Sequence, residues 1–209
     1  MAYRRTPRVE ARQAAARERI AAAAHDQVAE AGYASASVQA VAARAGVAVG
    51  SVYRHFPSKA ELVADVFRTA AERELTVVQE VAGPDGRRAP ERIAAAAEAF
   101  CRRALAAPTL AYAQLAEPVD PAVESERLRL RRGYRDVFAA VLAEGVEAGE
   151  LAPHDTTTVA AALVGALGEA LVGPLAAGTD GRHDALVATL VDFCLSSLPT
   201  TEGAPAWSP

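Results

Sequence analysis

The chain has 209 residues, 51% hydrophobic and 5% aromatic, which is enough apolar material for a sizeable core and excludes a wholly disordered chain. Abundant alanine and leucine favour packed helices over a sheet of aromatic and β-branched residues, so we expect an all-α fold. Residues 1–60 carry nine Lys/Arg against four Asp/Glu in a chain of net charge −4, which fits a nucleic-acid-binding N-terminus as well as a solvated mixed surface.

The first predicted elements are a tail and two helices. Residues 1–12 hold several arginines without apolar periodicity and are expected to form a flexible tail. Apolar residues at helical spacing follow, and Gly32 should end this first helix near Ala31 as a left-handed cap. Ser37 can cap a short second helix, which Gly46 stops.

A third helix should begin near Val49, with Val52 and Phe56 as its inward pair. It ends before Pro57, because the residue that precedes a proline disfavours helical geometry. The S-x-x-E sequence at residues 58–61 is a capping box that opens a fourth, longer helix.

The turn at residues 83–86, Gly-Pro-Asp-Gly, is the clearest break in the chain. Beyond it, prolines divide the sequence into a helix over about 90–107 and a short helix that ends near 117. A long helix follows, with Asp120 as its cap, apolar residues along one side and a charged, solvated other side.

Two C-terminal helices are predicted to carry more apolar surface than an outer helix of a monomeric protein can leave exposed to water. Asp155 caps the first, which is apolar almost all round over about 156–177, with Gly165 and Gly168 where neighbouring helices could approach closely. The second covers about 182–198. We therefore expect a homodimer in which two copies pack these helices into a four-helix bundle with two-fold symmetry.

Two short helices joined by a three-residue turn match the helix-turn-helix plan, in which the second helix enters the major groove of DNA. The first turn of that helix, Val49-Gly50-Ser51, presents small side chains, so its backbone can approach base edges closely. Donors to phosphate oxygens follow at Tyr53, Arg54, His55 and Lys59.

This stretch resembles the TetR (tetracycline-repressor) family, whose signature runs AGV-x-x-G-T/S-x-Y-x-H-F-x-S/N-K-x-x-L. Residues 45–62 read AGVAVGSVYRHFPSKAEL and match it nearly throughout. The match covers about residues 13–65, whereas the rest of the chain shares only the general helical plan. Ala48 is a departure, since members usually have serine or threonine there, and it leaves the recognition helix without its cap.

The resemblance implies a one-component transcriptional regulator, with a DNA-binding domain of three helices over 13–60 and a helical effector-binding and dimerisation domain over 61–199. Residues 1–12 and 200–209 would be flexible tails. Its partners would be double-stranded operator DNA, a small-molecule effector and a second copy of the chain, with effector binding moving the two DNA-reading ends apart. The resemblance places Ser37, Tyr53, His55 and Lys59 on phosphates, Gln39 at a base, and Val49, Gly50 and Ser51 in the groove.

An effector pocket is outlined by residues that the helical stripes turn inward without an obvious structural need: Phe100, Tyr112, Leu115, Tyr134, Phe138 and Glu169. Aromatic walls with at most a few charges favour an apolar or amphipathic effector, such as an acyl chain, an aromatic metabolite or a lipophilic drug, over a sugar or a nucleotide. Glu169 is either a polar anchor of this pocket, an exposed edge, or a structural partner of Arg127 or Arg131.

Two other classes of protein stay open at this point. An enzyme could use His25, His55, His154 or His183 in acid–base catalysis, yet none has a partner at catalytic spacing. No H-E-x-x-H, G-x-S-x-G, P-loop or G-x-G-x-x-G sequence occurs either, so we expect no enzymatic activity. An architectural DNA-binding protein would need the same N-terminal domain but no hollow C-terminal one.

Neither a cofactor nor a membrane partner is expected. Cys101 and Cys194 lie far apart without a CxxC partner, which favours two small core residues over a disulfide or a zinc site. The sequence shows no secretory signal, and the apolar run Val159–Gly168 is too short to span a bilayer before Glu169 interrupts it. We therefore expect a cytoplasmic location.

Overall fold

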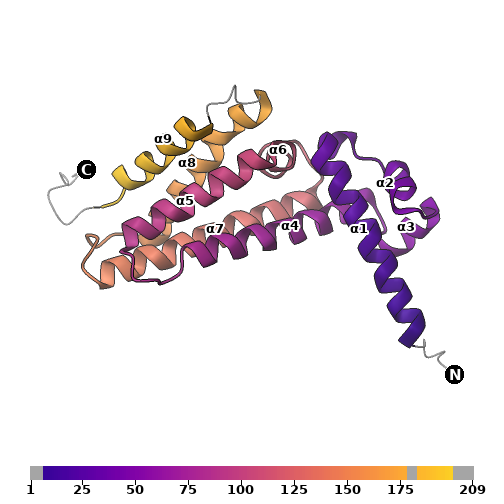
Figure 1. Cartoon of the computed structure of the whole chain (residues 1–209), viewed down its shortest axis with the longest axis horizontal. Coiled ribbons are helices and arrows are strands. Elements are labelled where there is room, and N and C mark those ends of the chain that lie inside the picture. Colours follow the sequence, from indigo (N-terminus) through magenta and orange to yellow (C-terminus); the bar gives the residue numbers. More distant parts are fainter. Residues whose placement is uncertain (1–6, 178–182, 200–209) are drawn as a thin grey trace.

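The structure is a computed structural model that describes residues 7–177 and 183–199. Over these residues the chain forms nine helices and no strand, which confirms the all-α fold class. In chain order they are α1 (Pro7–Ser35), α2 (Val38–Ala45), α3 (Val49–His55), α4 (Lys59–Val81), α5 (Ala89–Ala106), α6 (Pro108–Leu115), α7 (Pro121–Glu147), α8 (Thr156–Ala177) and α9 (His183–Ser196). We call α1 to α3 the head and α4 to α9 the body. Figure 1 shows an elongated molecule with the head at one end and α4 and α7 side by side along the body.

Helix α1 begins at Pro7, so residues 7–12, which we predicted as part of a flexible tail, are helical. Proline suits the first position of a helix, and the arginine, glutamate, glutamine and alanine residues that follow are good helix formers. These turns lack apolar periodicity because they are exposed, not because they are irregular. The rest of the two predicted tails, residues 1–6 and 200–209, lies outside the described residues.

The predicted helix ends of the head are largely confirmed. Gly32 interrupts α1 with the expected positive φ of 76°, although its ψ of 176° lies outside the left-handed helical region. The Ser37 hydroxyl accepts a hydrogen bond from the amide of Ala40 at 3.2 Å and caps α2. Gly46 ends α2 in the left-handed conformation, with φ 66° and ψ 38°. Local sequence signals therefore define the helix-turn-helix.

The head packs on the body through a shared core. Val52 and Phe56 point inward as predicted and are almost fully buried. Around them lie Ile20, Val28 and Val41 from the head, Phe67 from α4, Ala113 from α6 and Val123 from α7. Because α6 and α7 contribute to this core, a shift of either helix would disturb the packing of the head.

One face of α8 is covered within the chain, and the opposite face is not. The buried face packs against α5, α6 and α7 and consists of Ala160, Leu163, Leu167, Leu171 and Leu175. Length and composition alone would let α8 cross a membrane, a test that core helices of soluble proteins also pass. On α9, Phe193 is 48% exposed, so the prediction of an unpartnered apolar surface on the last helix is confirmed for the single chain.

The glycines of α8 do not mark a close contact between helices of one chain. A Cβ at Gly165 would meet no atom within 4 Å, and one at Gly168 would lie 3.8 Å from Leu115. The close approach is on α7, where a Cβ at Gly145 would lie 2.6 Å from the Cβ of Ala89. The position of Gly145 therefore sets how closely α7 packs against the start of α5.

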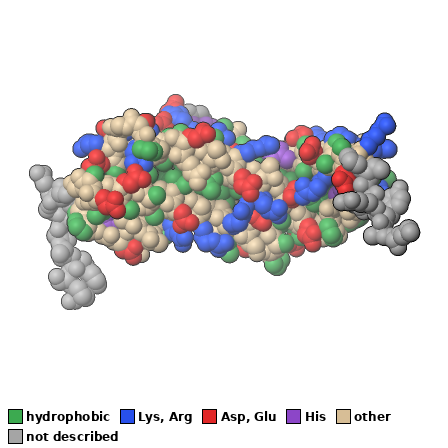
Figure 2. All heavy atoms as spheres, turned by 90° about the horizontal axis from the view of Figure 1, so that it is seen from below, with side chains coloured by type: hydrophobic (Ala, Val, Ile, Leu, Met, Phe, Trp, Pro, Cys, Tyr) green, Lys and Arg blue, Asp and Glu red, His purple; other side chains and the backbone are tan. Residues whose placement is uncertain are grey.

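Figure 2 views the molecule from the side of α4 and α7 and shows acidic and basic side chains interspersed over this face. Ion pairs join the two helices, among them Arg68 with Glu126 at 3.1 Å and Arg129 with Glu72 at 2.8 Å. Exposed pairs of this kind contribute only about 0–1 kcal/mol each to stability.

Candidate functional site

The helix-turn-helix presents an exposed surface at the far end of the head. Residues 46–48 form the predicted three-residue turn between α2 and α3, and Figure 1 shows both helices at this end. Val49 is 37% and Tyr53 is 47% exposed, which makes them two of the few large apolar side chains that the described residues leave in water. Gln39, Gly50 and Arg54 are exposed too. These five exposed positions belong to α2 and α3, whereas Ser37, Ser51, His55 and Lys59 are half-buried. Contacts of these residues with DNA stay a prediction.

Helix α3 lacks a side-chain cap, as its sequence predicts. Ala48 occupies the N-cap position and makes no side-chain hydrogen bond. Within the helix, the guanidinium of Arg54 donates to the hydroxyl of Ser51 at 3.1 Å. A base contact by Ser51 therefore has to compete with a bond inside α3.

Lys59 is held by its own chain. Its ammonium donates to the backbone carbonyls of Tyr33 at 2.8 Å and Ala34 at 3.4 Å, and it lies 4.5 Å from the centre of the Tyr33 ring. Burial lowers the pKa of Lys59 from its usual value. This side chain joins the start of α4 to the end of α1, a structural role that the resemblance did not indicate. A phosphate contact by Lys59 stays a prediction.

The segment between α6 and α7 is hydrogen-bonded to the end of α1. The carboxylate of Glu117 accepts hydrogen bonds from the amides of Tyr33 at 2.8 Å and Ala34 at 2.9 Å. The hydroxyl of Tyr33 donates to Asp120, whose carboxylate therefore does not cap α7 as we predicted. Gly32 makes room for this contact, since a Cβ there would lie 3.1 Å from the Glu117 carboxylate.

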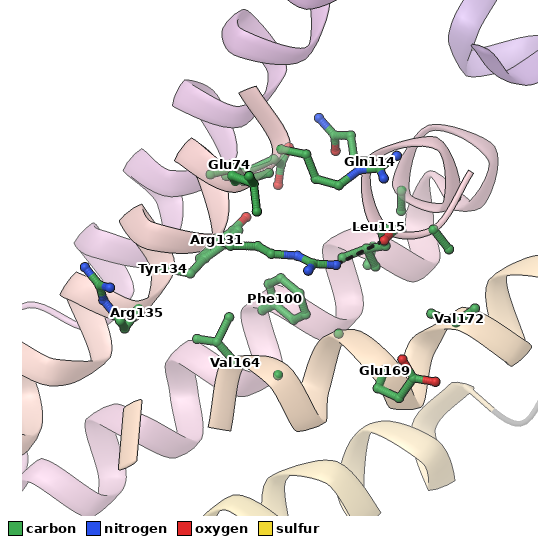
Figure 3. A pocket seen from close by; sticks show the side chains of 18 of the residues that line it. Glu74, Phe100, Gln114, Leu115, Arg131, Tyr134, Arg135, Val164, Glu169 and Val172 are labelled. Carbon is green, nitrogen blue, oxygen red and sulfur yellow. Dashed lines mark hydrogen bonds between the residues drawn. The ribbon is translucent and has the colours of Figure 1, made fainter. Parts of the chain in front are cut away.

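A cavity of about 610 Å³ lies inside the body, between α5, α6, α7 and α8 (Figure 3). Four of the six predicted pocket residues line it: Phe100, Leu115, Tyr134 and Glu169. Phe100 and Tyr134 form an edge-to-face pair with ring centres 5.0 Å apart. The volume is in the usual range for a small-molecule site.

The other two predicted pocket residues do not line the cavity. Phe138 is buried in the core of the body, and Tyr112 packs on that core while half-buried. A helical stripe shows only that a side chain points inward, and an inward residue can meet either packed neighbours or a cavity. The prediction that Phe138 and Tyr112 form the pocket wall is wrong for this structure.

Glu169 lies at an exposed edge of the cavity. The two arginines considered as its partners are engaged elsewhere, since Arg127 pairs with Glu124 at 2.8 Å and Arg131 donates to the carbonyl of Leu115 at 3.2 Å. Of the three alternatives for Glu169, the structure therefore supports the exposed edge over a buried structural pair.

The cavity carries far more positive charge than the predicted pocket. Five arginines line it: Arg103, Arg127, Arg131, Arg132 and Arg135. Arg103 pairs with Glu74 and Arg135 with Asp136, whereas Arg131 and Arg132 have no carboxylate within ion-pair distance among the residues that the structure describes. On α7 these side chains had the pattern of a solvated face, but long guanidinium side chains can extend back over an apolar surface. The expectation of few charges is therefore wrong.

The cysteines and histidines show no arrangement for metal binding. Within the described ranges, no group of three or more His, Cys, Asp or Glu residues could hold a metal ion. Cys101 and Cys194 are buried free thiols, and burial raises their pKa to about 12 and about 11. Such thiols stay protonated and unreactive near neutral pH.

Comparison with family models gives two matches. "Bacterial regulatory proteins, tetR family" matches residues 20–66, which covers most of the head and the first turns of α4. "Tetracyclin repressor-like, C-terminal domain" matches residues 86–171, which extends from α5 into α8. Together the two matches span more than half of the chain.

Solved structures share the fold over most of the chain. The regulator FadR from Bacillus subtilis in complex with stearoyl-CoA has a TM-score of 0.75 at 21% identity, over 86% of this chain and 98% of its own. Reduced NemR from Escherichia coli has a TM-score of 0.70 at 16% identity, over 90% of this chain and 100% of its own. A TetR/AcrR-family regulator from Thermobifida fusca has a TM-score of 0.65 at 26% identity, over 86% of this chain and 96% of its own. A search of curated proteins gives no match.

Proposed function

Because this chain belongs to the TetR family of bacterial transcriptional regulators, we propose that it is a repressor that leaves its operator when an amphipathic acid occupies the cavity of the body. The head would bind operator DNA, and the body would bind the effector and a second copy of the chain. The protein would act in the cytoplasm, where operator DNA lies.

The observation that carries this proposal is the composition of the cavity. Its apolar part, which includes Phe100, Leu115 and Val164, suits a hydrocarbon chain or ring system. Its arginines suit an anionic group, because two of them, Arg131 and Arg132, have no acidic partner in the described part of the chain. We therefore narrow the expected effector from an apolar or amphipathic molecule to one that joins an apolar part to an acid.

The B. subtilis FadR structure holds a molecule of this class, since stearoyl-CoA combines a long acyl chain with acidic groups. At 21% identity the likeness concerns the fold alone. Support for an acidic amphipathic effector therefore comes from the side chains around this cavity, and acyl-CoA esters and free fatty acids are both candidates.

On the DNA side, we propose that Gln39 and Ser51 read bases, that Val49 and Gly50 let α3 approach them, and that Ser37 and the residues at the end of α3 contact phosphates. The exposed position of Gln39 and of the first turn of α3 supports this division. Among the phosphate contacts are Tyr53, Arg54 and His55. Base contacts would set the operator sequence, whereas phosphate contacts would set affinity for DNA in general.

The dimer we propose uses the uncovered faces of α8 and α9. Phe193 and Leu195 are 48% and 37% exposed on α9, and the exposed face of α8 consists of small residues apart from Glu169. An apolar surface of this kind is usually an interface. Two-fold pairing would place two heads on one DNA duplex, as a palindromic operator requires.

The cavity also favours a ligand-responsive regulator over a purely architectural DNA-binding protein. A protein that only shapes or docks on DNA has no use for a cavity of about 610 Å³ lined by five arginines. Because both matching family models describe regulators, we also propose a binding function and not an enzymatic one.

The proposal is tested by selecting bound duplexes from a random DNA pool and titrating their complexes with candidate effectors. We expect a palindromic site, and its release by dodecanoate, palmitate or their CoA esters but not by phosphorylated sugars. Recovery of no sequence preference would overturn the DNA-binding part. Release by a phosphorylated sugar and by no acyl compound would overturn the effector class.

A further inference from the structure

Two buried donors without partners lie in the wall of the cavity. Gln114 and Arg127 are only 9% and 8% exposed, yet the amide nitrogen Nε2 of Gln114 and the Nε of Arg127 have no hydrogen-bond partner among the described residues. Both residues line the cavity. Buried polar groups are nearly always paired, so two such donors at one place indicate where a ligand oxygen can bind.

Hydrogen bonds to neighbouring carbonyls place these side chains close together. From α7, the Nη2 of Arg127 donates to the carbonyl of Ala113 at 2.9 Å, and an Nη2 of Arg131, one helical turn later, donates to the carbonyl of Leu115 at 3.2 Å. These two bonds bring both arginines to the segment of α6 that carries Gln114, and all three residues line the same cavity. Figure 3 shows Arg131 extending across the cavity to Leu115, and Gln114 at the same end.

The charges around Gln114 favour an anion. Glu124 pairs with Arg127, which makes that pair neutral, but Arg131, an exposed residue at the rim, adds a positive charge and donates to a backbone carbonyl rather than to a carboxylate. Two acidic side chains line the cavity: Glu74 is bound to Arg103, and Glu169 lies at the exposed edge on α8. A carboxylate beside Gln114 and Arg131 would receive charge-assisted hydrogen bonds and neutralise the remaining charge.

We propose that Gln114, Arg127 and Arg131 form a head-group subsite that binds the carboxylate of a free amphipathic acid. The apolar tail then extends along Phe100 and Val164. This inference rests on the proposed function, and it deepens it by naming the group that is recognised and the side chains that bind it.

The experiment measures direct binding of dodecanoate and dodecan-1-ol to the full-length protein by calorimetry without DNA. The wild type is expected to bind the acid at least about tenfold more tightly than the alcohol, the effect of one or two hydrogen bonds to a charged group. The variants Gln114→Met and Arg131→Met should each lower this preference severalfold. The matched controls Gln79→Met and Arg129→Met, which alter exposed residues outside the cavity, should keep it.

A thermal melt without ligand separates recognition from a structural role. Gln114→Met replaces an unpartnered amide with an apolar side chain of similar size, so its melting temperature should equal or exceed that of the wild type. A lower melting temperature with an unchanged preference for the acid would assign Gln114 to the core and overturn the subsite.

The remaining outcomes separate this inference from the proposed function. Equal binding of acid and alcohol would overturn the subsite. If only dodecanoyl-CoA binds and releases operator DNA, the proposed function stands and the carboxylate subsite does not. If none of these compounds binds, both fall.

Discussion

The carboxylate of Glu117 accepts a hydrogen bond from the backbone amide of Tyr33 at 2.8 Å, across 84 residues of sequence. The backbone carbonyl of the same glutamate accepts a hydrogen bond from Arg127 at 2.6 Å. Glu117 is thus bonded on one side to the head and on the other to a residue that lines the cavity. We propose that this residue couples effector binding to the position of the head.

The first prediction concerns this coupling. Replacing Glu117 with alanine removes the acceptor for the amides of Tyr33 and Ala34 and should lower the free energy of unfolding by about 1.5–3 kcal/mol. Effector affinity should change little, because the Glu117 side chain points to the head and the cavity does not include it. The effector concentration needed for half-release of the operator should rise at least about fivefold. The control is Glu98→Ala, on the exposed face of α5, and release at the wild-type concentration in both variants would contradict a coupling role.

Lys59 gives a prediction that separates folding from DNA binding. Because its ammonium donates to two carbonyls at the end of α1, Lys59→Met should lower the free energy of unfolding by about 1–3 kcal/mol. Arg54→Met, at an exposed position of α3, should change it by about 0.5 kcal/mol or less. Denaturant unfolding measures both. Unchanged stability in Lys59→Met, together with a flatter salt dependence of DNA binding, would instead make Lys59 a phosphate contact.

Base readers and phosphate contacts should differ in the selectivity of their variants. Gln39→Ala should relax the preference at particular base pairs by about 1–3 kcal/mol. Tyr53→Phe should weaken binding to all duplexes about equally and leave the salt dependence unchanged, because the lost hydroxyl carries no charge. Affinities for a set of single-base operator variants, at several salt concentrations, provide the test. A uniform loss in both variants would show that Gln39 does not read bases.

The cap of α8 should make part of the stability depend on acid pH. Hydrogen bonds from the hydroxyl and amide of Thr158, and then from the amide of Thr157, hold the pKa of Asp155 below its usual value of 3.8. Since the folded state favours the carboxylate, the stabilisation is present above the unfolded pKa and is lost as the pH falls through the lower, folded one. The difference in the free energy of unfolding between wild type and Asp155→Ala should therefore be largest near neutral pH and should shrink toward zero in acid. A difference that is constant down to the acid transition would contradict this cap.

Dimer formation is tested on α9. Phe193→Glu places a charge in the proposed interface and should shift the protein toward a monomer at micromolar concentration, as measured by light scattering. Val9→Glu, an equally exposed apolar position on α1, is the matched control. A wild type that is already monomeric would refute the dimer, and an unchanged dimer in Phe193→Glu would place the interface elsewhere.

Much of the head follows from the sequence because its signals are local. Ser37, Gly46 and the inward pair Val52 and Phe56 act within a few residues of their own positions, and each has its predicted role. The family resemblance added the orientation of α3, which local rules alone leave open. Residues 7–12 were missed because an exposed helix has no apolar stripe.

The body could be predicted only in outline. Helical stripes showed that Tyr134 and Phe138 point inward, but not that the first lines a cavity and the second fills the core. The bond from Glu117 to Tyr33 joins residues from distant parts of the chain, and no local pattern indicates it. The arginines of α7 were misinterpreted because their direction depends on the neighbouring helices.

The central claim, that cavity and DNA surface are linked, is tested most directly by one measurement: the Kd of the effector for the protein with and without saturating operator. Linkage is reciprocal, so if the effector weakens operator binding, operator must weaken effector binding by the same factor. We predict that dodecanoate, or its CoA ester, binds the operator complex at least about fivefold more weakly than the free protein. An equal Kd in the two states would contradict the account, because a ligand with the same affinity for both states cannot shift the equilibrium between them.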